Sequence, residues 1–516
     1  MFRKNDAHLQ RSFFAVDELL SKSQMKEFQK SREWWYYELV FKRIDEKLFE
    51  PLYSEDEKSR PNAPINSMVS ALILHSTGRW SYEFLMRQVR FDLLTRKAIG
   101  LTSFDEVPFC EATLFNFQKK LLAHAVSTGS HLIEQIFDGL TAKQLETLKI
   151  KTDLQRCDSL QVESNIRSYS RIQLLIEVLL RLYRIMSDDD KKQFGSLFAP
   201  YAGKTSGQYI YKVEQDKFDK ELEQLAEAYR ALCETVKSTY GETDIARIFA
   251  RVFEEHFTSV DSKIVVKSSE ELHSGCLQSP DDEEATYRKK RGVGYRGLLT
   301  ATETCNPENE VQLITDIHVT ANNRDDSDEL HDRLDGIKEK TPEIGVLYTD
   351  GGYGSEENDE KMKDLGIEQI QTAIKGRESA VDIVITKSQD GLYEVHCPHQ
   401  SAEVCQGRKR LKATFDGKVC ESCPMRDVCP SIVRKSCHVV YFDDQDVLRQ
   451  KRQRNIQGLP VERRGLRANV EATMREFSRR TEGGKLKVRG IFKAQMFALT
   501  TAIGINFGRV YRHAQN

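Results

Sequence analysis

The sequence predicts an α/β protein: a mixed β-sheet core with a helical N-terminal domain, a large helical insertion and a small cysteine-rich segment. Two observations carry this prediction. Between residues 290 and 390, short apolar runs typical of buried strands alternate with stretches of helical character, an order that favours an α/β sheet. Before and after that region, apolar residues recur at the three- and four-residue spacing of amphipathic helices.

Length and composition narrow the class of protein. A chain of 516 residues exceeds what one hydrophobic core supports, so several domains are expected. Charged residues make up 30% and apolar residues 39%, as in soluble globular proteins. The net charge of -2 gives no global sign of a polyanion partner, so any nucleic-acid site must be a local patch. We find no signal peptide and no apolar run that spans a bilayer, and we therefore expect a cytoplasmic protein without membrane contact.

Residues 1–150 are predicted to form a helical domain. Apolar residues at helical spacing fill three segments, 67–78, 81–100 and 111–126. Paired short helices of this kind occur in helix-turn-helix domains and also in plain helical bundles, and the bundle is the simpler interpretation.

The core is predicted to begin with a strand at 156–163, where alternate residues would lie on opposite faces. A helical insertion over 168–289 interrupts it, and the apolar segment 171–186 within that insertion is expected to be buried. The polar stretch 268–292 is expected to be a loop. The remaining core elements are expected to be a hairpin of strands at 294–305 and 311–321, a helix at 326–340, a strand at 344–350, a helix at 355–366 and a strand at 367–374.

Asp350 lies in the segment VLYTDGGYGS, directly after a predicted buried strand and before two glycines. The glycines permit a sharp turn, and Ser355 suits the N-cap of the next helix. Ligand sites of open α/β sheets form at such strand ends. Asp350 is therefore either a turn-forming residue or a catalytic ligand, and the segment alone does not decide between them.

Two further acids are candidate site residues. Asp158 lies within the first predicted strand, on its more apolar face, where an unpaired carboxylate is costly, so a metal ion or a cationic partner is expected. A solvated strand end is the alternative. Glu471 lies beside the apolar stripe of a predicted helix, with Arg467 and Arg475 four residues to either side. On helix statistics alone, these three residues would form a surface ladder of ion pairs.

Taken together, these segments resemble the DDE transposases of bacterial insertion sequences. The resemblance is carried by CDSLQVESN (157–165) for the family's first-aspartate strand, YTDGGYGS (348–355) for its second-aspartate motif, and RANVEATMREF (467–477) for its Arg-x-x-x-Glu helix. Residues 294–326 are similar to the family's hairpin and helix entry, and residues 60–101 to its helical N-terminal domain.

The resemblance implies a ribonuclease-H-like catalytic core built from residues 151–167 and 290–390 and completed by C-terminal helices in 446–516. The implied activity is metal-dependent cleavage and strand transfer of DNA. The implied partners are terminal inverted repeats and target DNA, bound by a homodimer in the bacterial nucleoid with the 1–150 domain contacting DNA. Two other functions stay open: a non-catalytic DNA-binding or domesticated relative, and a metal-dependent nuclease of the same fold without strand transfer.

The resemblance also implies a catalytic triad of Asp158, Asp350 and Glu471. These acids would hold two Mg²⁺ or Mn²⁺ ions, with Asp158 bridging the two. Two ions suit an in-line displacement at phosphorus, because one activates the nucleophile and the other stabilises the leaving oxygen.

A basic region surrounds Glu471. Residues 449–493 contain 14 lysines and arginines against 4 glutamates, an excess of ten positive charges in a chain of negative net charge. Such a patch suits a track for DNA phosphates, and an ordinary solvated helix face is the alternative. The residues expected to contact DNA are Arg463, Arg464, Arg467, Arg475, Arg479, Arg480, Lys485 and Lys487.

Six of the 11 cysteines lie between residues 397 and 437. Without an export signal, thiols or metal ligands are expected rather than disulfides. Four sulfur ligands for a tetrahedral structural Zn²⁺ are available in the segment 391–445, namely Cys397, Cys420, Cys423 and Cys429. Reduced thiols without metal are the alternative, and the further candidate ligands are Cys405, Cys437, His399 and His438.

Overall fold

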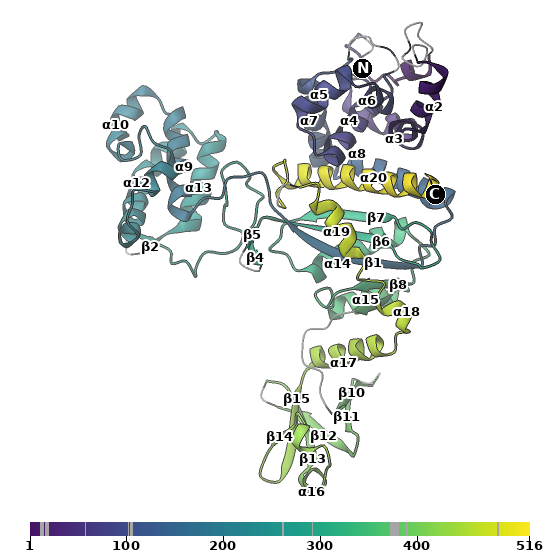
Figure 1. The fold of residues 1–516 in the computed structure, drawn as a ribbon. Coiled ribbons are helices and arrows are strands. Elements are labelled where there is room, and N and C mark those ends of the chain that lie inside the picture. The colour runs from purple at the N-terminus through teal and green to yellow at the C-terminus, as the bar shows by residue number, and fades with distance from the viewer. Residues whose placement is uncertain are drawn as a thin grey trace.

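The computed structural model of the chain describes residues 1–10, 15, 20–56, 58–101, 103, 107–260, 263–290, 293–371, 381–388, 391–407, 409–481 and 484–515. Figure 1 shows a helical domain at the N-terminus, a central sheet with helices on its faces, a helical insertion to one side and a small sheet domain at the far end. The mixed α/β architecture predicted from the sequence is confirmed. None of the helices in the described ranges combines the length and apolar character needed to cross a membrane.

The N-terminal domain is helical. Its helix α4 (Ile65–Gly78) is buried along most of its length, because small and apolar residues fill every face. The other elements of the domain are η1 (Ala7–Leu9), α2 (Lys22–Lys30), α3 (Arg32–Leu39), η2 (Phe41–Arg43), η3 (Glu46–Leu52), α5 (Tyr82–Phe91), α6 (Leu93–Ala98), α7 (Glu111–Thr128) and α8 (Leu132–Thr147).

The long helix α20 (Ile491–Gln515) lies between the N-terminal domain and the central sheet (Figure 1). It packs against α4 and α8 on one side and against the sheet on the other. A Cβ on Gly504 would lie 1.9 Å from Thr77 Cγ2 of α4, so the lack of a side chain allows this close approach. One continuous hydrophobic core therefore joins the N-terminal helices, α20 and one face of the sheet.

The central sheet has five strands in the order β7–β6–β1–β8–β9. β1, β6 and β7 pair antiparallel, whereas β8 and β9 continue the sheet from β1 in parallel. The predicted hairpin is thus the pair β6–β7. The strands are β1 (Leu154–Val162), β6 (Gly297–Thr304), β7 (Ile314–Thr320), β8 (Val346–Thr349) and β9 (Glu368–Gln371).

The opposite face of the sheet is covered by α14 (Asp326–Lys340) and α15 (Glu356–Asp364). Leu334 of α14 and Leu347 of β8 belong to a separate apolar cluster between these layers. Acidic residues in the first turn of α14 and lysines in its last turn complement the helix dipole, and the helix has the bounds that the sequence predicted.

The insertion is a separate helical unit with its own hydrophobic core. Its helix α9 (Arg171–Ile185) is buried, as its apolar composition predicted. The remaining elements are α10 (Asp188–Phe198), α11 (Ser206–Ile210), η4 (Gln215–Lys217), α12 (Phe218–Thr239), α13 (Asp244–His256), β2 (Phe257–Val260) and β3 (Lys263–Val266). A second short hairpin, β4 (Arg288–Lys290) with β5 (Val293–Tyr295), then leads to β6, where the sequence indicated only a loop before residue 293.

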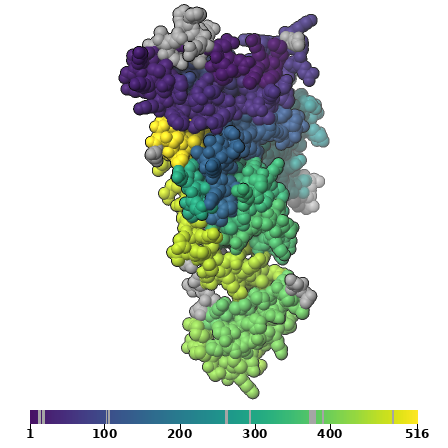
Figure 2. All heavy atoms as spheres, turned by 90° about the vertical axis from the view of Figure 1, so that its right-hand side faces the viewer, coloured from purple at the N-terminus to yellow at the C-terminus, as the bar shows by residue number. Residues whose placement is uncertain are grey.

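The cysteine-rich segment folds as a six-stranded antiparallel sheet in the order β10–β11–β12–β13–β15–β14. Figure 2 shows this domain at the end of the molecule opposite the N-terminal domain. Its elements are β10 (Val384–Lys387), β11 (Tyr393–Cys397), β12 (Gln400–Gln406), β13 (Leu411–Asp416), α16 (Gly417–Glu421), η5 (Arg426–Val428), β14 (Ile432–Val433) and β15 (Cys437–Phe442).

Helix α17 (Asp444–Gln457) connects the small domain to the core. Gln450 hydrogen bonds the backbone of Ile383 and Ile385, beside and within β10, while Arg452 Nη2 donates to the carbonyl of Ser355 at 3.1 Å. Two short helices then return the chain to the central sheet, α18 (Val461–Arg464) and α19 (Val470–Ser478).

Candidate active site

Asp158 and Asp350 lie side by side on neighbouring strands. β1 and β8 run parallel, with Arg156 paired to Tyr348. Two residues further along both strands, the same register places Asp158 opposite Asp350. β8 ends at Thr349, so Asp350 lies at the strand end, where the sequence indicated a ligand site or a turn.

One guanidinium contacts both carboxylates. Arg467 Nη2 lies 3.3 Å from Asp158 Oδ1 and 3.8 Å from Asp350 Oδ2. Two neighbouring carboxylates repel each other, and a shared cation offsets that repulsion. The cationic partner that the sequence indicated for Asp158 is therefore Arg467, which was expected to contact DNA.

The two aspartates differ in exposure. The Asp158 side chain is 13% exposed and that of Asp350 is 39% exposed. Burial raises the pKa of Asp158, although Arg467 and the N–H of Ser159, which donates to Oδ1 at 2.9 Å, act in the opposite direction. Asp350 Oδ1 accepts the N–H of Gly352 at 2.8 Å, so Asp350 shapes the turn as well as facing Arg467.

A third carboxylate, which the sequence analysis missed, lies at this site. Asp326 is the first residue of α14, and its Oδ1 accepts a hydrogen bond from Ser159 Oγ at 2.9 Å. A Cβ on Gly352 would lie 3.1 Å from Asp350 Oδ1 and 3.5 Å from Asp326 Oδ2, so both carboxylates border the same turn. Burial raises the pKa of Asp326 despite the Ser159 hydrogen bond, and the charge of Asp350 raises it further. We refer to Asp158, Asp326 and Asp350 as the aspartate cluster.

Glu471 stands apart from this arrangement. Its side chain on α19 is 58% exposed, and its ion pair is with Arg475 at 3.9 Å, as in the surface ladder that helix statistics favoured. Within the described residues, no group of three acidic, histidine or cysteine side chains is arranged to hold a metal ion. The structure therefore brings together two of the three predicted catalytic acids.

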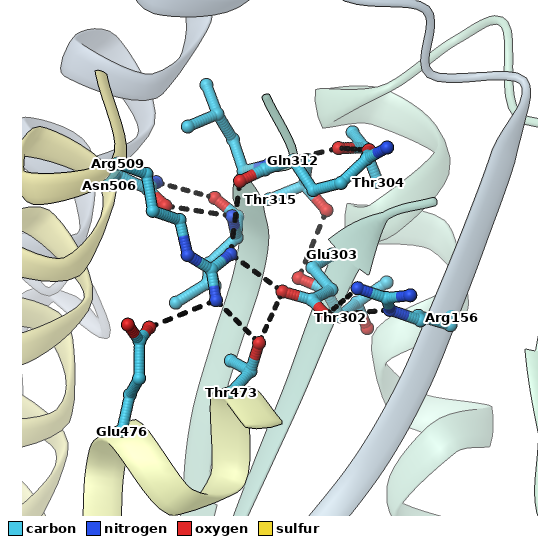
Figure 3. A network of polar contacts seen from close by, with 12 residues as sticks. Arg156, Thr302, Glu303, Thr304, Gln312, Thr315, Thr473, Glu476, Asn506 and Arg509 are labelled. Atoms are coloured by element: carbon cyan, nitrogen blue, oxygen red, sulfur yellow. Dashed lines mark hydrogen bonds and ion pairs between the residues drawn. The ribbon is translucent and has the colours of Figure 1, made fainter. Parts of the chain in front are cut away.

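A buried polar network holds α19 against the sheet (Figure 3). Its centre is Glu303 of β6, which is fully buried. Arg156 Nε donates to Glu303 Oε1 at 2.7 Å, while Thr473 Oγ1 and Arg509 Nη1 donate to Oε2 at 2.6 and 2.8 Å. Strand β1, helix α19 and helix α20 thus all contact the Glu303 carboxylate of β6.

The network around Glu303 includes residues next to Asp158 and residues next to Glu471. Arg156 precedes Asp158 by two residues on β1, and Thr473 follows Glu471 by two residues on α19. Arg156 Nη1 also donates to the carbonyl of Leu466 at 2.7 Å, next to Arg467. These bonds fix the backbone around both acids, although the Glu471 carboxylate itself points into solvent.

The side chains predicted to contact DNA fall into two groups. Arg463, Arg475, Arg479 and Lys487 are exposed, as a phosphate contact requires. Three others are partly buried: Arg467 contacts the aspartates, Arg480 Nη1 donates to the carbonyl of Glu476, and Lys485 Nζ donates to the carbonyl of Ile166. The side chain of Arg464 lies outside the part of the chain that the structure describes.

The predicted zinc ligands line one pocket of the small domain. The pocket is bordered by Cys397, Cys420, Cys423, Cys429, His399 and His438. Burial and the other three cysteines raise the pKa of Cys420. Gln400 Nε2 donates to Cys420 Sγ at 3.2 Å, and Cys429 Sγ lies 3.1 Å from Ser431 Oγ. The four sulfurs share a cavity, but they do not form a metal-binding group in this conformation.

Two protein-family models match the chain. One, described as a transposase DDE domain, matches residues 393–511, from β11 to α20. The other, described as a transposase domain (DUF772), matches residues 24–120, from α2 to α7. No curated protein and no solved structure matches the chain.

Proposed function

Because these two matches indicate an insertion-sequence transposase of the DDE type, we propose that the chain cleaves DNA strands and joins them to new sites at Asp158 and Asp350, in a ribonuclease-H-like core. The observation that carries this proposal is the pair of carboxylates placed opposite each other by the β1–β8 register and sharing Arg467. The mixed sheet, antiparallel on one side of β1 and parallel on the other, supports the fold assignment.

The donor atoms of this site suit Mg²⁺ or Mn²⁺, which prefer carboxylate and water oxygens. We propose that Asp158, Asp350 and Glu471 hold two such ions. Bound divalent ions would activate the attacking oxygen and stabilise the leaving oxygen. Arg467 contacts the oxygens that the ions would use, so the guanidinium and the ions compete for the two aspartates.

The segment that carries Arg467 also carries Glu471, four residues later. Withdrawal of Arg467 from the aspartates and approach of Glu471 to them would therefore be one movement of the same stretch of chain. Glu471 is exposed and holds a single weak ion pair, so little opposes such a movement at the carboxylate itself.

The family implies DNA binding. We assign the contact with terminal inverted repeats to the helical N-terminal domain and to the exposed arginines Arg463, Arg475 and Arg479 around α19. Insertion of an element joins both of its ends to the target DNA, so we propose that two copies of the chain act together on paired DNA ends.

The test is a cleavage assay with a DNA duplex that carries the terminal inverted repeats of the element itself, in the presence of Mg²⁺. We expect the wild-type protein to nick the repeat ends. Asp350→Ala and Glu471→Ala should lose cleavage and retain DNA binding, whereas Asp328→Ala, an exposed acid on α14, should cleave as the wild type does. Cleavage by either of the first two variants at a near wild-type rate rejects the triad.

We further propose that the cysteine pocket binds a structural Zn²⁺, because four cysteines and two histidines line one cavity. Metal analysis of the purified protein should find one zinc per chain, and Cys423→Ser should lower that content and the melting temperature. Cys405→Ser, at an exposed cysteine of β12, should change neither. Protein purified without zinc contradicts this part of the proposal.

A further inference from the structure

The short hairpin β4–β5 lies where the helical insertion joins the central sheet (Figure 1). Arg288 pairs with Tyr295, Lys289 with Gly294 and Lys290 with Val293. Strand β4 of this hairpin consists of three basic residues. In sequence alone, such a run is as readily a solvated loop as a binding surface, so its position in the fold has to decide between the two.

The base of the hairpin is anchored to the active-site strand. Asn322, which is fully buried, accepts a hydrogen bond from Thr286 Oγ1 at 2.7 Å and returns its own N–H to that oxygen at 3.0 Å. Asn322 Nδ2 also donates to Gln161 Oε1 at 3.3 Å. Gln161 lies on β1, three residues after Asp158, so the start of the hairpin is tied to the strand that carries the first aspartate.

The rest of the hairpin is anchored as well. Arg288 Nη1 lies 3.4 Å from the carbonyl oxygens of Asn322 and Arg324, in the loop that leads to Asp326. Directly after β5, Arg296 Nη1 pairs with Glu163 Oε1 at 2.9 Å, and its N–H donates to the carbonyl of Val162. These bonds hold the hairpin beside the aspartate cluster.

The two faces of the hairpin have different surroundings. Residues two apart on a strand share a face, so Arg288 and Lys290 lie on one side and Lys289 on the other. Burial raises the pKa of the Asp326 carboxyl, and the charges of Arg288 and Lys290 oppose that rise. Both lysines are exposed, and neither forms an ion pair with any residue in the described ranges.

We propose that the Arg288 and Lys290 face of the hairpin binds a DNA phosphate next to the one that is cut. This inference rests on the proposed transposase function, and it adds a DNA contact in the insertion to those expected around α19. A DNA strand entering the aspartate cluster meets three carboxylates and one guanidinium, an arrangement that repels phosphate. An exposed ammonium that forms no ion pair within the described ranges, carried by a hairpin anchored beside that cluster, offsets the repulsion and positions the strand.

The test compares Lys290→Ala and Lys290→Glu with Lys289→Ala, a matched control on the opposite face of the same hairpin. Binding of a fluorescently labelled terminal-repeat duplex is measured by anisotropy between about 50 and 200 mM salt, the range over which phosphate contacts lose strength. Lys290→Ala should weaken binding by about threefold to tenfold. It should also lower the slope of log K against log salt concentration by about one, and Lys290→Glu should weaken binding further. Lys289→Ala should match the wild type, and all three variants should keep the wild-type melting temperature.

Cleavage kinetics separate this inference from the proposed function. If the wild type cleaves the duplex, Lys290→Ala should raise KM with little change in kcat, because the contact lies outside the reacting atoms. Equal binding and equal salt slopes for Lys290→Ala and the wild type, or an equal loss in Lys289→Ala, overturn the hairpin contact while leaving the triad intact. A wild type that binds but never cleaves overturns the proposed function, and the Lys290 comparison in the binding assay still stands.

Discussion

The strand-borne and helix-borne halves of the candidate site are held in different ways. Asp158 and Asp350 are placed by backbone pairing, since the register of β1 against β8 sets their relative position. Glu471 is placed only by the packing of α19, which side chains hold through Glu303 and its partners. A slip of the sheet register would move every side chain, whereas loss of a few side-chain hydrogen bonds would be enough to release the helix. The position of Glu471 therefore depends on the Glu303 network, whereas the positions of the two aspartates depend on the backbone.

The largest expected effect comes from removing the centre of the network. Glu303→Gln leaves Arg156 and Arg509 buried without their shared carboxylate, which should cost about 3–5 kcal/mol of unfolding free energy. Chemical denaturation measures the loss. Hydrogen exchange should show α19 losing more protection than β1 and β8.

The matched control for Glu303 is Glu462→Gln, at an exposed position of α18, which should change stability by less than about 0.5 kcal/mol. Equal loss of protection in α19 and in β1 would show that the two halves are not held separately, and the comparison would fail.

A smaller effect is expected on the strand-borne half. Asp326→Asn keeps the size of the side chain that meets Ser159 but removes one charge beside Asp350, so we expect cleavage to fall about 10- to 100-fold, the usual cost of losing a supporting group at a metal site. The measurement is the single-turnover rate at several Mg²⁺ concentrations. Asp328→Asn, two residues further along α14, should cleave normally, and an unchanged rate in Asp326→Asn would remove Asp326 from the site.

The smallest effect is a change of stability with pH. Burial raises the pKa of Asp158, so the protonated carboxyl favours the folded state. This contribution is present below the ordinary aspartate pKa and is lost as the pH rises through the raised value. Asp158→Asn, which resembles the protonated form, should therefore melt at a higher temperature than the wild type at pH 7, and the difference should shrink toward pH 4.

The outcome that contradicts this pH prediction is a lower melting temperature of Asp158→Asn at pH 7. It would mean that the ion pair with Arg467 outweighs the cost of burial. The same scan on Asp328→Asn controls for the general effect of removing an acidic group.

Most elements of the core could be predicted from the sequence, because their patterns are local. The helix α14 was predicted from its acidic start and basic end, and the hairpin β6–β7 from two alternating runs around a turn. Asp350 was recognised because two glycines follow a buried strand. The contact of Arg467 with both Asp158 and Asp350 could not be predicted, because it depends on which strands are neighbours in the sheet. No local sequence pattern contains that information.

Two features of the structure have no recognisable pattern in the sequence. Asp326 is one of several acids in the first turn of α14, a pattern that the helix dipole already explains, so its contact with Ser159 was hidden. The six-stranded sheet of the small domain was not predicted, because many of its strand residues are exposed and the cysteines directed the interpretation to a zinc site. Its strand pattern is weak because the domain buries few side chains.

The position of α20 has a consequence for how the polypeptide is made. Helix α20 ends at Gln515, so the ribosome completes it long after α4, yet the helix packs against both α4 at the start of the chain and β7 in the middle. Until then, the apolar surfaces of the N-terminal helices and of one face of the sheet lack the helix that covers them. A chain that stops before residue 491 should therefore leave both apolar surfaces uncovered and prone to aggregate.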